Sequence, residues 1–203
     1  HGMLFFVLQI AGLAVFNTDN LIIAHYLGAE QVTPYAVAMR LVGYATALQA
    51  LLIPSLWPAL SEAYVGGDMV WIRKSYRRIM HAPLLIVTSA ALLLGFTGRW
   101  VISVWAGKAA VPGSLLLWGM CFWIILLSIT LNQGALLAAT QHLQLQAIYS
   151  SIAAVVNLIL SIVLVQHLGA IGVLLATIIS YLLFIVFPAT WQVRQILRGR
   201  YLH

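Results

Sequence analysis

Long apolar runs, separated by short polar segments, make up most of this chain of 203 residues. A helix needs about 20 mostly apolar residues to cross the hydrocarbon core of a bilayer, and six stretches meet that length. We expect spans at about residues 3–26, 33–59, 82–105, 111–133, 145–166 and 169–191, and helix could continue beyond the fourth to Thr140. The pattern predicts an all-α, polytopic membrane protein with no soluble domain.

The composition excludes the main alternatives to a membrane protein. Hydrophobic residues make up 63% of the chain and charged residues 7%, whereas an ordinary soluble domain has about 25% charged residues. Ten Lys and Arg and four Asp and Glu cannot cover the surface of a soluble fold. A disordered chain would need low hydrophobicity and high charge, so that class is excluded as well.

The basic residues predict how the spans are oriented. Seven of the ten fall on one side of the predicted spans, namely Arg73, Lys74, Arg77, Arg78, Arg194, Arg198 and Arg200. Arg99 and Lys108 fall on the other side. The positive-inside rule therefore predicts that both termini of this segment are cytoplasmic. Residues 69–79 also resemble a basic amphipathic stretch at the membrane interface, with Trp71 as an anchor. The net charge of +6 fits this arrangement and does not indicate a nucleic-acid partner.

Two ionisable residues, Asp19 and Arg40, lie well inside predicted spans. Both are expected roughly 10 Å below the outer membrane surface, on helices joined by a short loop. Each would cost about 2.5–3.5 kcal/mol at the centre of a helix inserted in a membrane. Two interpretations stay open at this stage. The residues form an ion pair between helices or Arg40 extends to the interface, or they line a polar cavity, in which case Tyr44 shares the face of Arg40.

The remaining polar residues indicate helix packing rather than chemistry. Asn157, in the middle of the fifth span, is expected to hydrogen-bond to a neighbouring helix. Cys121 lies in an apolar run and is expected to be buried. The histidines have no metal-ligand spacing. The sequence contains no hydrolase, protease or nucleotide-binding motif, so we predict neither an enzyme nor a cofactor.

Several short segments, in their order along the chain, resemble a known family. They are Asp19-Asn20-Leu21-Ile22-Ile23, Leu27-Gly28, Tyr35-Ala36-Val37-Ala38, Arg40-Leu41, Asn132-Gln133-Gly134, Asn157-Leu158, Leu168-Gly169-Ala170-Ile171-Gly172 and Ala176-Thr177-Ile178-Ile179-Ser180. This pattern resembles the second half of a polysaccharide biosynthesis protein of the oligosaccharide flippase type, the type that moves O-antigen. That family belongs to the multidrug/oligosaccharidyl-lipid/polysaccharide exporter superfamily.

The resemblance implies a fold, a function and partners. The chain would be the C-terminal six-helix lobe of a two-lobe transporter whose N-terminal lobe is missing, or a half that dimerises with a second copy. The cargo would be a lipid-linked oligosaccharide on an undecaprenyl pyrophosphate carrier. It would cross the bacterial cytoplasmic (inner) membrane by alternating access, in contact with membrane lipids. The residues expected to line the cavity are Arg40, Asp19, Tyr44 and Asn20.

Other functions remain as alternatives. A multidrug or cation antiporter lobe of the same superfamily would need acidic cavity residues, and Asp19 is the one available. A six-span permease domain would need longer cytoplasmic loops to reach a nucleotide-binding partner. A non-transporting membrane subunit would use Asp19 and Arg40 for helix packing alone.

Overall fold

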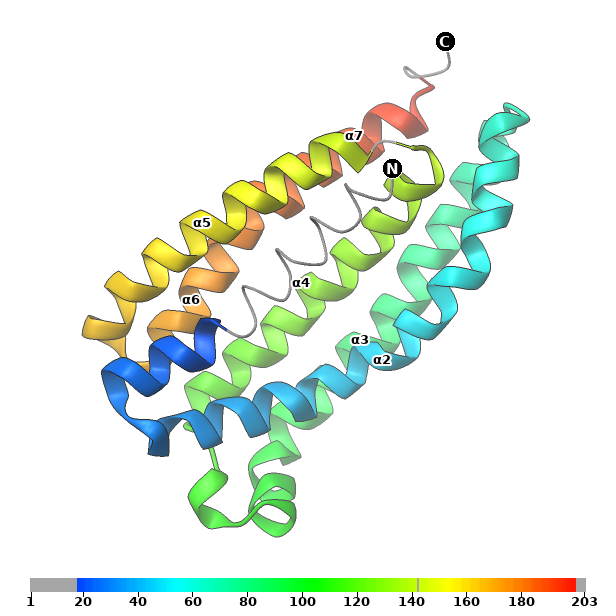
Figure 1. Ribbon diagram of the computed structural model, residues 1–203. Coiled ribbons are helices and arrows are strands. Elements are labelled where there is room, and N and C mark those ends of the chain that lie inside the picture. Colours follow the sequence, from blue (N-terminus) through cyan, green and yellow to red (C-terminus); the bar gives the residue numbers. More distant parts are fainter. Residues whose placement is uncertain (1–17, 142, 200–203) are drawn as a thin grey trace.

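The computed structural model describes residues 18–141 and 143–199, and their elements are helices arranged as a bundle (Figure 1). Helical residues 18–27 lead into the long helices, and the 3-10 helix η1 (Lys108–Ala110) precedes the fourth span. The long helices are α2 (Ala29–Val65), α3 (Met69–Trp105), α4 (Ser114–Ala139) and α5 (Leu143–Leu168). The last span consists of α6 (Ala170–Tyr181), the π-helix η2 (Leu182–Val186) and α7 (Phe187–Leu197).

The structure confirms two parts of the sequence prediction: the described elements are helices, and several of them could cross a membrane. Within the described residues, four helices are long and apolar enough to cross a membrane: Met69–Trp105, Ser114–Ala139, Leu145–Leu168 and Ala170–Leu197. The helix α2 is not among the four, and most of the expected span 3–26 lies outside the described residues. The six-span lobe therefore stays a prediction.

The helix α3 differs from expectation because it includes the basic stretch that we expected to lie separately at the interface. It begins at Met69, where the Asp68 carboxylate accepts a hydrogen bond from the Trp71 backbone N–H at 2.9 Å. This is the usual way in which an aspartate caps a helix N-terminus. The 37 residues of α3 correspond to a length of about 55 Å, whereas the hydrocarbon core is about 30 Å thick. One part of α3 must therefore extend beyond the core.

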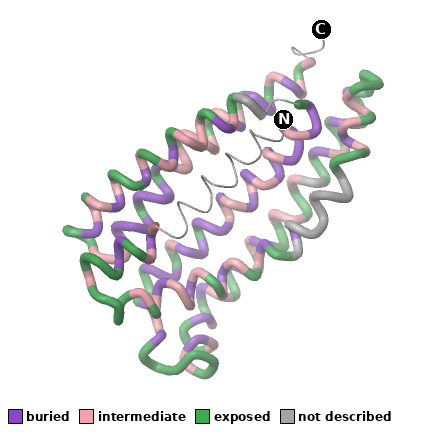
Figure 2. The backbone as a smooth tube through the Cα atoms, in the orientation of Figure 1, coloured by how far each residue is buried: buried purple, intermediate pink, exposed green. Residues whose placement is uncertain are grey.

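The helix α4 occupies the centre of the bundle, where it packs against α2, α3, α6 and α7 (Figure 2). Its sequence is apolar on all sides, which is expected of a helix surrounded by others. Trp123, Leu117 and Met120 are buried in a cluster toward one end of the bundle. Leu136 and Leu137 belong to a second cluster toward the other end. The outer helices α2, α3, α6 and α7 thus share α4 as a common packing partner.

Glycines allow α5 and α6 to form a tight hairpin. Gly169, with φ of 64°, joins the two helices in a left-handed conformation that favours glycine. At Gly172, a Cβ atom would overlap the backbone carbonyl of Leu164 in α5. The absence of a side chain thus lets the two helices approach closely, as small residues commonly do between membrane helices.

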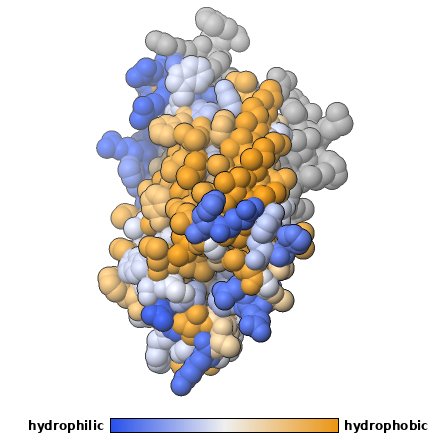
Figure 3. All heavy atoms as spheres, turned by 90° about the vertical axis from the view of Figure 1, so that its left-hand side faces the viewer, coloured by the Kyte–Doolittle hydropathy of each residue, from blue (hydrophilic) through white to orange (hydrophobic). Residues whose placement is uncertain are grey.

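The outer surface of the bundle is largely apolar. The side shown in Figure 3 carries a broad hydrophobic area across its middle. Exposed side chains on α5 include Ile148, Val155 and Ile159. In water such a surface would favour association or aggregation, but in a bilayer it is the surface that lipid tails contact.

Candidate functional site

A buried polar cluster forms around Asp19, which is 2% exposed. The Tyr35 hydroxyl of α2 donates a hydrogen bond to Asp19 Oδ2 at 2.9 Å. The Thr177 hydroxyl of α6 lies 3.3 Å from the same oxygen. Asn157 Nδ2 of α5 donates in turn to Thr177 Oγ1 at 2.9 Å. Residues from four helices thus form one hydrogen-bond network that includes the Asp19 carboxylate.

The hydrogen bonding of this cluster is incomplete. Within the described residues, Asp19 Oδ1 is buried without a hydrogen-bond partner, and so is the side-chain Oδ1 of the next residue, Asn20. The single hydroxyl hydrogen of Thr177 is also shared between Asp19 Oδ2 and the Val173 carbonyl, which lies 3.2 Å away. A buried polar atom without a partner costs free energy. Asp19 Oδ1 can therefore accept a further hydrogen bond.

The ion pair between Asp19 and Arg40, one of the two interpretations left open by the sequence, does not form among the described residues, where Asp19 contacts Tyr35 and Thr177 instead. Asp19 is buried inside the bundle, whereas Arg40 is exposed on α2. The difference comes from the loop, because the sequence suggested several loop residues where the chain turns at Gly28 and α2 begins at Ala29. Counted from this turn at 1.5 Å per residue, Asp19 lies about 13 Å deep, Tyr35 about 10 Å and Arg40 about 18 Å. Tyr35 is therefore the nearer in depth, and it lies on the buried face of α2 where it reaches Asp19, whereas Arg40 lies on the exposed face.

A second feature is the exposed face of α2, which carries Arg40, Tyr44 and Ala47. Tyr44 is 59% exposed. The sequence predicted that Tyr44 and Arg40 share one face of their helix, and both side chains are exposed on α2. The part of the chain that the structure describes leaves this face uncovered, and it combines a cation with an aromatic hydroxyl on a helix within the bundle.

The opposite face of α2 is fixed by hydrogen bonds to α4. Gln49 Nε2 donates to the Ser128 carbonyl and to Asn132 Oδ1, both at 2.9 Å. The Ser128 hydroxyl donates back to Gln49 Oε1 at 2.7 Å. Because Gln49 is held inward, Arg40 and Tyr44 must point outward. The orientation of the exposed face is therefore set by the core.

The structure divides the four predicted site residues into two places. Asp19 belongs to the buried cluster, whereas Arg40 and Tyr44 lie on the exposed face of α2. Asn20 follows Asp19 on the same helix, and its side-chain oxygen is buried. Asn157 makes the interhelical hydrogen bond that the sequence predicted. Sequence reasoning missed Tyr35, Thr177 and Gln49. Tyr35 could have been found from a tight turn at Gly28, since an antiparallel hairpin brings residues equally far from its turn to one depth.

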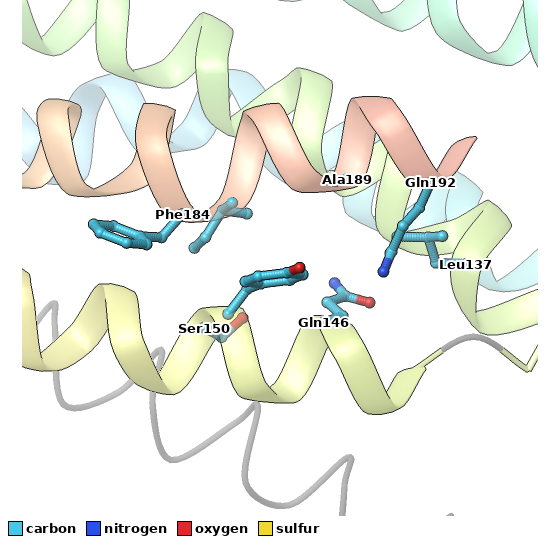
Figure 4. A pocket seen from close by; sticks show the side chains of 8 residues that line it. Leu137, Gln146, Ser150, Phe184, Ala189 and Gln192 are labelled. Atoms are coloured by element: carbon cyan, nitrogen blue, oxygen red, sulfur yellow. The ribbon is translucent and has the colours of Figure 1, made fainter. Parts of the chain in front are cut away.

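A small pocket lies between α4, α5 and the last span, about two helical turns from Asn157 and Thr177 of the cluster (Figure 4). Gln146 and Gln192 face it, and within the described part of the chain Gln146 Oε1 and Gln192 Nε2 have no hydrogen-bond partner. Its other lining residues are Leu137, Tyr149, Ser150, Phe184, Ile185 and Ala189.

Among the described residues, no three His, Cys, Asp or Glu side chains gather in a way that could hold a metal ion.

Comparison with known proteins finds a distant relative. The chain is 24% identical over 195 residues to a protein of Salmonella typhimurium named "Putative O-antigen transporter". The match covers 94% of this chain and 45% of that protein, so the chain spans less than half of the relative's length. No family model and no solved structure matches the chain. The resemblance suggested by the sequence is thus confirmed as a distant one: over nearly its whole length, this helical membrane segment is similar to an O-antigen transporter.

Proposed function

We propose that this chain forms one half of a transporter that moves a lipid-linked oligosaccharide across the bacterial cytoplasmic membrane. The observation that carries the proposal is the exposed face of α2, where Arg40 and Tyr44 lie side by side on a helix turn. The sequence predicts a span over most of α2, and a cation there in contact with lipid tails would be costly, so such a residue usually faces water or protein. A second lobe, or a second copy of the chain, would enclose this face as a cavity.

The chemistry of the face suits the proposed cargo. The guanidinium group of Arg40 can form two parallel hydrogen bonds to a pyrophosphate, which a lysine cannot reproduce. Tyr44 offers a flat ring and a hydroxyl for contact with a sugar. Alternating access would then expose Arg40 and Tyr44 first to the cytoplasmic side and later to the outer side. The basic ends of α3 and α7 would face the cytoplasm under the positive-inside rule.

The buried Asp19 cluster is proposed to couple transport to a small cation or a proton. It joins helical residues 18–27 to α2, α5 and α6, so a change in its charge would alter contacts among four helices. The unpartnered Asp19 Oδ1 is the atom available for the incoming positive group. In this proposal Asp19 controls how the helices pack and does not touch the cargo.

Export of surface polysaccharide tests the role of Arg40. Cells that lack their own O-antigen transporter would receive the complete protein with Arg40→Ala, Arg40→Lys or the control Arg99→Ala, at matched membrane abundance. Arg99 is a suitable control because it is also exposed but lies on α3, where it donates a hydrogen bond to Ser114 Oγ. We expect export to fall by more than ten-fold for Arg40→Ala, to recover partly for Arg40→Lys and to stay normal for Arg99→Ala.

Two results would contradict the proposal. Normal export by Arg40→Ala would show that the cation has no part in transport, and equal loss in the Arg99→Ala control would show that any missing arginine harms the protein.

The multidrug alternative is less well supported, because a cationic drug needs an exposed acidic group in the cavity. Asp19 is buried, and the exposed charge on α2 is positive.

A further inference from the structure

The structure brings two basic segments together that lie more than a hundred residues apart. Arg73 Nε, near the start of α3, donates a hydrogen bond to the Leu197 carbonyl at the end of α7, at 2.6 Å. Arg194 and Arg198 of α7 are exposed near this contact. The start of α3 and the end of α7 therefore form one basic end of the bundle (Figure 1).

Four basic residues near the start of α3 gather on one side of the helix. Lys74, Arg77, Arg78 and His81 follow the spacing of three and four residues that places side chains on one helical face, and all four are exposed. Within the described residues, no ion pair or hydrogen bond engages the side chain of Lys74, Arg77 or Arg78. Their positive charge is thus available to a partner outside the bundle.

The same side of α3 becomes apolar immediately beyond these cations. Leu85, Leu92 and Phe96 continue it and are 68%, 49% and 79% exposed. The distance along the helix from Lys74 to His81 is about 10 Å, and from Leu85 to Phe96 about 17 Å. These lengths resemble one headgroup layer and one half of a hydrocarbon core that is about 30 Å thick.

We infer that this surface, the α3 lipid face (Lys74, Arg77, Arg78, Leu85, Leu92 and Phe96), binds an anionic phospholipid of the bilayer. The phosphate oxygens would accept hydrogen bonds from Arg77, Arg78 and Lys74, and the acyl chains would lie along Leu85 and Leu92. Charge complementarity and the matched lengths of the two parts identify the partner as a lipid rather than a free anion. The inference does not depend on the proposed transport function.

Lipid binding to the purified protein tests this inference. Dioleoyl-phosphatidylglycerol and dioleoyl-phosphatidylcholine, which share acyl chains and differ in charge, would be titrated separately, with bound lipids counted by native mass spectrometry. The test variant is Arg77→Gln/Arg78→Gln. The matched control is Arg99→Gln/Lys108→Gln, which removes the same charge from exposed positions on the opposite side of the predicted membrane.

We expect the unaltered protein to prefer phosphatidylglycerol and to lose this preference at high salt, because exposed charges are screened. The preference should fall by about five-fold or more in Arg77→Gln/Arg78→Gln, since each basic residue near the surface contributes appreciably to anionic-lipid binding. It should be unchanged in the control. Helical circular dichroism and size-exclusion profiles would establish that both variants are folded.

The inference would be overturned by equal affinity of the unaltered protein for the two lipids, or by the same loss in the control variant. Glycerol phosphate, which has the charged group without acyl chains, provides a further check. We expect no binding of it at concentrations that saturate with phosphatidylglycerol. If it bound equally well, the surface would be an anion site without a lipid partner.

Discussion

At the scale of single residues, buried side-chain hydrogen bonds determine which face of each helix points inward. Gln49 is the clearest case, because it forms hydrogen bonds to both Ser128 and Asn132 of α4. Tyr35, Thr177 and Asn157 play a similar part around Asp19. In a bilayer the hydrophobic effect does not drive helices together, so packing and polar contacts of this kind carry more of the specificity.

Replacement of Gln49 tests this role. We expect Gln49→Ala to destabilise the protein by about 1–3 kcal/mol, because Ser128 and Asn132 lose a buried hydrogen-bond partner. The same substitution at the exposed Gln31 of α2, Gln31→Ala, is the matched control and should change stability little. Denaturation of both variants in detergent micelles, followed by circular dichroism, measures the difference. Equal stability of the two variants would show that the hydrogen bonds between α2 and α4 do not matter.

At the scale of elements, the sequence located helices better than it located their ends. The basic stretch 69–79 and the span 82–105 form one helix, α3, because the Asp68 cap starts it early and Pro83 does not stop it. The span expected at 169–191 is interrupted by the π-helix η2, directly before Pro188, which lacks a backbone N–H. Local sequence signals are weakest at helix ends, where one capping residue or one turn decides the boundary.

The hairpin of α5 and α6 allows a test at this scale. We expect Gly172→Ala to destabilise the protein by about 1–3 kcal/mol, since its Cβ would overlap the Leu164 carbonyl and separate the helices. Gly43→Ala in α2 is the matched control, because a Cβ there meets nothing within 4 Å. The control should be neutral or slightly stabilising, as alanine favours helix over glycine.

Thermal unfolding of the two glycine variants in the same detergent would compare them directly. A Gly172→Ala protein as stable as Gly43→Ala would mean that α5 and α6 can move apart without cost. In that case the close approach at Gly172 would not be needed to hold the hairpin.

At the scale of the whole molecule, the central question is which exposed surface faces water and which faces lipid. Tyr44 on α2 and Val155 on α5 are both 59% exposed in the bundle, so exposure alone does not distinguish them. The proposed function does distinguish them, because it places Tyr44 in an aqueous cavity and Val155 among lipid tails. The polar neighbour of Tyr44 is Arg40, whereas Val155 has apolar exposed neighbours such as Ile152 and Ile159.

Chemical labelling of introduced cysteines separates these environments. We expect a charged, membrane-impermeant maleimide to react with Tyr44→Cys in membranes that contain the complete protein, and to react at least ten-fold more slowly with Val155→Cys. A maleimide needs a hydrated thiol, which a lipid-facing position does not provide. The native Cys121 is buried and free, so it should give little background. Equal labelling of both positions would contradict an aqueous face on α2.

The sequence by itself determined the class of the protein, because a chain with this little charge can bury its apolar surface only in a membrane. It also singled out Asp19 and Arg40 as the two costly residues, and it predicted the hydrogen-bonding role of Asn157. The tertiary structure alone decided their partners. The turn at Gly28 sets the register in which Tyr35 of α2 reaches Asp19, the packing of α6 brings Thr177 to the same carboxylate, and Arg40 is left exposed. With about 3.6 residues per turn, a shift of even one or two residues turns a side chain from one face of a helix toward another, and a sequence without the turn geometry does not fix that register.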